Sequence, residues 1–132
     1  MLRDLFDQNT IVKIGLQEWV FARGSKEARI HTFVYLKDNK ILSIGEDSST
    51  GERVDIFSGE IGSDLRYQLM RGLFLCGIRK ISGGFLIRPR IKIQGVSSLH
   101  DILNGEEREL LLRLAKENGA MEAVIDTPCS GE

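Results

Sequence analysis

The sequence predicts one α/β domain in which helices flank a mixed β-sheet. Three observations predict it. The first half of the chain alternates short β-branched runs with turn residues, and two later segments have the spacing of amphipathic helices. Each of these helices is followed by an apolar run typical of a strand, so the last three elements predict parallel strands joined by a right-handed crossover. The length of 132 residues fits one compact domain.

Composition argues against several classes of protein. Hydrophobic residues make up 42% and charged residues 28%, which is typical of a globular domain rather than a disordered chain. The 18 basic and 19 acidic residues nearly balance, which argues against a nucleic-acid binder with a basic face. The cysteines, Cys76 and Cys129, are too few for a disulfide-rich secreted domain. No apolar run is long enough for a membrane span, so we expect a cytoplasmic protein.

The first half of the chain predicts a block of strands and hairpins. Four segments rich in β-branched and aromatic residues predict strands: 10–14, 19–22, 29–36 and 41–44. The clearest is 29–36, which alternates with Ile30 and Val34 on one face and Phe33 and Tyr35 on the other. We therefore expect one strand there, covered on both sides for part of its length. A tight turn at 37–40, an exposed loop at 46–53 and a short strand at 54–57 complete the block.

A helix is predicted from Ser63 onwards. Leu65, Leu69, Leu73 and Cys76 recur at helical spacing, and basic residues follow where they favour the negative end of the helix dipole. Gly72 and Gly77 weaken a helix by about 1 kcal/mol each relative to alanine. We therefore expect these two glycines to mark close packing against another element.

The last part of the chain predicts a strand, a helix and a strand. Segment 87–93 is the first strand, with Ile91 and Ile93 on one face. Asn104 begins the helix, and Glu107 stands three residues later, the spacing of a capping box. The buried face of the helix is expected to hold Leu110, Leu111, Leu114 and Ala115. A left-handed cap at Gly119 and a short strand at 123–125 follow.

Several strings span nearly the whole chain, at residues 1–6, 33–46, 88–93, 107–108, 119–120 and 122–128. Taken in order, they resemble the MreB family of bacterial actin-like, rod-shape-determining proteins. The resemblance implies the ribonuclease H-like fold of domain I of the actin-like ATPases. Residues 1–132 would then form a single actin-like domain, with residues 1–9 as an N-terminal amphipathic tail.

The sequence departs from the family at the turn that holds phosphate. Actin-like ATPases carry Asp-x-Gly-Thr in the first hairpin, where the Asp helps to hold the metal and the Thr contacts phosphate. Here Gly15 remains, but Lys13 takes the place of the Asp and Leu16 that of the Thr. A lysine cannot ligate Mg²⁺ and a leucine cannot hydrogen-bond to phosphate. Lys13, Gly15 and Leu16 thus predict a vestigial phosphate turn.

The resemblance implies a binding protein rather than an enzyme. The sequence stops where an actin-like ATPase would cross into its second domain, which supplies the other walls of the nucleotide cleft. We therefore expect no ATPase activity and no cofactor or metal. The expected role is a cytoskeletal assembly module that forms a homodimer or binds a filament protein. The alternative is one half of an ATP-binding protein, completed by another chain and using ATP and Mg²⁺.

Two further sets of residues have competing interpretations. The family places its catalytic Glu near the start of the second helix, where Glu106 and Glu107 stand, but acidic residues there also cap amides and offset the helix dipole. We assign no catalytic residue and keep these two as candidates. Leu2, Leu5 and Phe6 would form a membrane-contact face, although basic residues are scarce beside them. The alternative for them is a frayed or docked N-terminus.

A basic run is predicted on the strand that follows the first helix. Arg88, Arg90 and Lys92 alternate along it, so their side chains share one face. Such a face could bind an anion or an acidic partner, and the other interpretation is a solvated sheet face.

Overall fold

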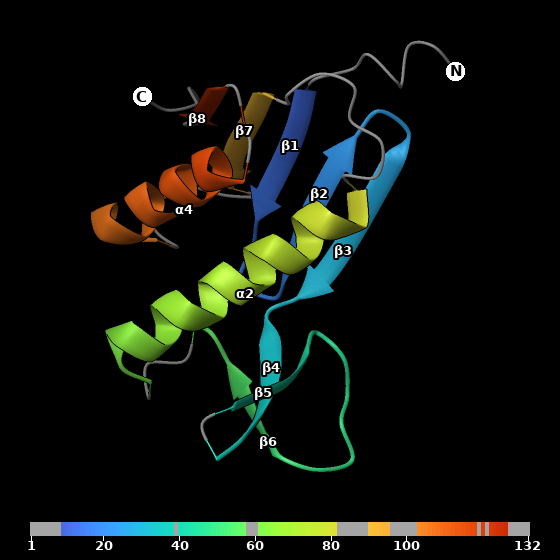
Figure 1. Cartoon of the computed structure of the whole chain (residues 1–132), viewed down its shortest axis with the longest axis vertical. Coiled ribbons are helices and arrows are strands. Elements are labelled where there is room, and N and C mark those ends of the chain that lie inside the picture. Colours follow the sequence, from blue (N-terminus) through green and yellow to red (C-terminus); the bar gives the residue numbers. More distant parts are fainter. Residues whose placement is uncertain are drawn as a thin grey trace.

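Two β-sheets and two helices make up the structure, a computed structural model that describes residues 9–38, 40–57, 61–81, 90–95, 103–118, 120 and 122–126. The first elements in the chain are the strands β1 (Asn9–Ile14), β2 (Glu18–Arg23), β3 (Lys26–His31), β4 (Phe33–Lys37), β5 (Lys40–Ile44) and β6 (Glu52–Asp55). They are followed by α2 (Ser63–Ile81), β7 (Arg90–Gly95), α4 (Gly105–Glu117) and β8 (Glu122–Asp126). The chain therefore has the predicted α/β class with a mixed sheet (Figure 1).

The larger sheet has five strands in the order β3-β2-β1-β7-β8. β2 runs antiparallel to both β1 and β3, while β7 pairs in parallel with β1 on one side and with β8 on the other. The predicted parallel strands at the end of the chain are thus confirmed. Because β1, β7 and β8 point the same way, the turn after β1 and the last residues of β7 lie at the same end of the sheet.

The prediction of a single strand over 29–36 is wrong. This segment is divided at Thr32 into β3 of the larger sheet and β4 of a three-stranded sheet with the order β5-β4-β6. The N–H of Thr32 donates to the Gln17 carbonyl at 3.0 Å, and the Thr32 carbonyl accepts from the Ile56 N–H at 3.0 Å. Thr32 therefore pairs with two loop segments instead of a strand, and the chain passes between the sheets at this residue.

Both helices pack on the same side of the larger sheet (Figure 1). α2 contacts β2 and β3, α4 contacts β8, and the helices contact each other. Under them lies the main core, to which the sheet contributes Val12, Ile14, Trp19, Phe21, Ile30, Ile91 and Ile93. We call this the covered face. The sequence predicts helices flanking the sheet without assigning them to one face, and no described helix lies on the other.

The two glycines of α2 meet their neighbours as predicted. A Cβ built on Gly77 would overlap the ring of Phe21, so β2 approaches the helix backbone directly. A Cβ on Gly72 would lie 3.2 Å from Cδ1 of Ile44 in the smaller sheet. The Phe21 ring also packs edge-on against Phe74 of the same helix, with ring centroids 5.9 Å apart. Gly77 thus lets α2 come close enough to the larger sheet to enclose that ring.

Candidate functional site

The predicted phosphate turn lies between β1 and β2. Ile14 and Gly15 are buried, whereas Lys13 is exposed and the Leu16 side chain is 57% exposed. Lys13 pairs in register with Val20 of β2, so its side chain belongs to the sheet face opposite the helices. The turn therefore exposes the aliphatic side chain of Leu16 at its tip, and the Lys13 side chain lies on the sheet face opposite the helices.

Thr32 holds this turn in place. Its Oγ1 donates a hydrogen bond of 2.7 Å to the Leu16 carbonyl, and its N–H bonds to the Gln17 carbonyl. Thr32 is itself buried, because it stands where the chain passes between the two sheets. The Thr32 hydroxyl therefore reaches the turn but donates its hydrogen bond to the Leu16 carbonyl of the backbone.

The start of α4 is a complete capping box, as predicted. The Asn104 side chain accepts from the Glu107 N–H at 2.8 Å, and Glu107 Oε1 accepts from the Asn104 N–H at 2.9 Å. Two amides that would otherwise lack partners at a helix start are satisfied in this way. The reciprocal pair fixes the Glu107 side chain back over the first turn of its own helix.

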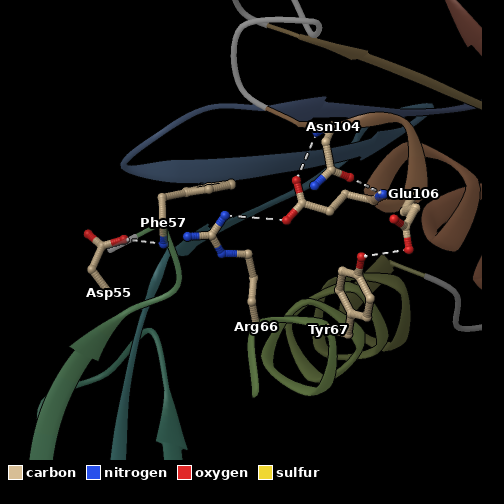
Figure 2. Close-up of polar contacts among 7 residues, drawn as sticks. Asp55, Phe57, Arg66, Tyr67, Asn104 and Glu106 are labelled. Carbon is tan, nitrogen blue, oxygen red and sulfur yellow. Dashed lines mark hydrogen bonds and ion pairs between the residues drawn. The ribbon is translucent and has the colours of Figure 1, made fainter. Parts of the chain in front are cut away.

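Both candidate carboxylates contact α2 (Figure 2). Glu107 Oε2 lies 3.4 Å from the Arg66 guanidinium, and Glu106 Oε2 accepts from the Tyr67 hydroxyl at 3.4 Å. Burial of the Tyr67 phenol and the nearby charge of Glu106 raise the pKa of Tyr67 above its ordinary value of 10.0. These contacts join the first turns of the two helices.

Glu107 and Glu106 differ in what they can reach. Glu107 is only 2% exposed, and both of its oxygens already have partners from the protein, so it has a structural role in capping and helix pairing. Glu106 is exposed. Neither is brought together with Lys13, because α4 packs on the covered face and the Lys13 side chain belongs to the opposite one.

The face of the larger sheet opposite the helices carries an alternating set of apolar and charged side chains, and we call it the open face. In register across the strands it is formed by Ile11, Lys13, Glu18, Val20, Ala22, Glu27, Arg29, His31, Arg90, Lys92, Gln94, Glu122 and Val124, and the same register places Asn9 and Asp126 on it. The predicted pairing of Arg90 with Lys92 on one face is confirmed, and both are exposed. The sequence indicated these cations but not that Lys13 joins them, since strand order alone brings β1 beside β7.

The remaining candidates add no metal or membrane site within the described ranges. No group of three or more His, Cys, Asp or Glu side chains gathers there to hold a metal ion. Cys76 is partly buried and packs against the core. Neither α2 nor α4 has the length and apolar character needed to cross a bilayer. Leu2, Leu5 and Phe6, together with Arg88 and Cys129, lie outside the described residues.

No protein-family model matches the sequence, and no curated protein matches it significantly.

Proposed function

We propose that this chain is an MreB-like, actin-like domain that does not hydrolyse nucleotide and acts in the cytoplasm as a cytoskeletal interaction or assembly module. The strand order supports the proposal. An antiparallel β1-β2-β3 unit with β7 and then β8 added in parallel beside β1 is the arrangement expected for domain I of an actin-like ATPase. The ordered sequence strings and the sheet topology therefore point to the same ribonuclease H-like architecture.

The geometry around the Gly15 turn supports a role without hydrolysis. Lys13 and Leu16 replace a metal ligand and a phosphate ligand, and the Thr32 hydroxyl is bonded to the Leu16 carbonyl. Glu107 is buried in its capping box, where it cannot position a water molecule for attack. Lys13, Gly15 and Leu16 thus offer no acidic ligand for Mg²⁺, and the Thr32 hydroxyl and the Glu107 carboxylate are each already bonded within the described part of the chain.

The open face is the observation that carries the proposed interaction role. Parallel sheets are usually covered on both faces, but α2 and α4 cover only one face of the parallel strands β1, β7 and β8. The side that no described helix covers still carries aliphatic residues such as Ile11 and Val20, which are half-buried, and Val124, which is 44% exposed. A second protein surface would cover them.

Two measurements test this function. Titration calorimetry with ATP and Mg²⁺ should give no binding heat, and co-sedimentation with MreB filaments or sedimentation velocity of the chain alone should show association. A strict monomer that stays in the supernatant would contradict the interaction role. ATP binding that falls with Lys13→Ala and survives Leu16→Ala would instead favour half of an ATP-binding protein, completed by another chain.

A further inference from the structure

The open face combines aliphatic groups and cations in adjacent rows. Ile11 pairs with Ala22 on one side and with Lys92 on the other, and Lys92 in turn pairs with Val124. A depression runs across β1, β7 and β8 at this level, and Ile11, Lys92 and Val124 are among its lining residues. The stem of a lysine packs well along apolar surface, so this row offers one continuous aliphatic strip with an ammonium group at its rim.

The arginines of the open face form ion pairs with glutamates, whereas two of its lysines do not. Arg29 lies 2.8 Å from Glu18 and 3.2 Å from Glu27, and Arg90 lies 3.9 Å from Glu122. Lys13 and Lys92 have no ion pair or hydrogen bond with any described residue. They stand on adjacent strands two register positions apart, since Lys13 pairs with Gln94 and Ile11 with Lys92. Among the side chains that the structure describes, the centre of the open face is therefore apolar and positive, and glutamates pair with the arginines at its margins.

We propose that the open face binds an amphipathic segment of a partner protein, with its apolar stripe on Ile11, Val20 and Val124 and with carboxylates beside the stripe that pair with Lys13 and Lys92. This inference rests on the proposed interaction role and names the chemistry of the partner. Covering the aliphatic strip removes apolar area from water, and carboxylates supply the two missing counter-charges.

Other occupants fit these charges less well. Two copies packed face to face around a twofold axis near β1, the central strand, would bring their uncompensated lysines together, and like charges oppose association. A nucleic acid would find Arg29 and Arg90 already paired with glutamates at the margins of the face, which leaves only Lys13 and Lys92 for its phosphates. An acidic amphipathic segment can pair its carboxylates with Lys13 and Lys92 at the centre of the open face without reaching the strands at its two edges.

The test uses the full chain and synthetic helical peptides of about 18 residues, or roughly five turns. One peptide has a leucine stripe flanked by glutamates, and its matched control carries lysines instead. Backbone NMR shifts should move at β1, β7 and β8 with the acidic peptide, and the basic peptide should bind at least about tenfold more weakly. Equal binding of the two peptides would overturn the proposal.

Charge-reversal variants locate the binding site. Lys13→Glu with Lys92→Glu should weaken binding of the acidic peptide by about tenfold or more, because two attractive pairs become repulsive. Lys37→Glu with Lys40→Glu makes the same change of charge on the hairpin of the smaller sheet and should alter binding by less than about twofold. All four lysines are exposed, so both variants should keep the melting temperature of the parent chain. Similar losses in the two variants would overturn the site.

The remaining outcomes separate this inference from the proposed function. Co-sedimentation with MreB filaments that persists in Lys13→Glu with Lys92→Glu, without any peptide binding, overturns only the inference. Binding of an oligonucleotide in preference to the acidic peptide also overturns it, as does a dimer that the same double variant dissociates. Binding of ATP with Mg²⁺, with no association of any kind, would instead overturn the proposed function.

Discussion

The two faces of the five-stranded sheet are made by the same strands but hold very different side chains. The covered face presents residues such as Ile93 and Phe21, which are fully buried against the helices. The open face presents Lys92 and Val20 from the same two strands, one exposed and one half-buried. Since consecutive residues of a strand point to opposite sides, one strand can contribute to the core and to the open face at once. Substitutions one residue apart should then have different consequences.

The largest contrast is expected between two isoleucines on neighbouring strands. Ile93→Ala removes fully buried methyl groups and should lower the free energy of unfolding by about 2–5 kcal/mol. Ile11→Ala, on the open face, should lower it by less than about 1 kcal/mol, because its side chain is already partly hydrated. Equilibrium urea unfolding followed by circular dichroism measures both, and equal losses would contradict the division into two faces.

The close approach of α2 to the covered face gives the next effect. Gly77→Ala places a methyl group inside the Phe21 ring and should cost about 1–3 kcal/mol of unfolding free energy. Gly72→Ala is the matched control, because its new methyl meets only the flexible end of Ile44 and the helix gains about 1 kcal/mol in propensity.

The Gly77 effect has a second test. Phe21→Leu added to Gly77→Ala should recover part of the loss, since the smaller side chain vacates the overlapping volume. Thermal unfolding of the single and double variants would show this coupling. If the two substitutions were simply additive, the contact between Gly77 and Phe21 would not be the cause.

The polar contacts at the start of α4 should contribute less to the free energy of unfolding, and Glu107 should contribute more than Glu106. Glu107→Ala removes a cap and the ion pair with the partly buried Arg66, at a cost of about 1–3 kcal/mol. Glu107→Gln keeps the capping geometry and should lose less. Glu106→Ala removes only an exposed contact to Tyr67 and should change stability by under about 0.5 kcal/mol. Chemical unfolding of the three variants checks the order.

The smallest effect is expected at alkaline pH. Because burial and Glu106 raise the pKa of Tyr67 in the folded chain, its stabilising contribution is constant below the ordinary value of 10.0 and is lost as the pH rises through the higher folded value. The free energy of unfolding should therefore fall more steeply with pH above the ordinary pKa of 10.0 for the parent chain than for Tyr67→Phe. Identical slopes would mean that the phenol titrates alike in the folded and unfolded chains.

Local features of the fold could be predicted because they depend on neighbours in sequence. The capping box of Asn104 and Glu107 needs only a spacing of three residues, and the structure contains both of its hydrogen bonds. The glycines of α2 were recognisable because a helix tolerates them at a cost that close packing can offset. For the candidate site, the residues of the Gly15 turn could be identified from the sequence. The shared face of Arg90 and Lys92 could also be predicted, because alternate residues of a strand lie on one face.

The division of segment 29–36 could not be predicted, because its apolar alternation continues without interruption through Thr32. What ends the strand is a set of bonds from Thr32 to Leu16, Gln17 and Ile56, and these residues approach only when the chain is folded. The buried position of Glu107 beside Arg66 likewise depends on two helices that are distant in sequence.

By itself the sequence determined the class of the fold, the approximate limits of most elements and the absence of acidic and hydroxyl groups from Lys13, Gly15 and Leu16, since each depends on residue type and short-range spacing. The tertiary structure alone decided that α2 and α4 lie on one side and that Lys13 stands near Lys92 with no ion pair to either from a described residue. Strand order is a long-range property: many distant contacts fix it together, and no local pattern along β1 or β7 encodes which strand will be its neighbour.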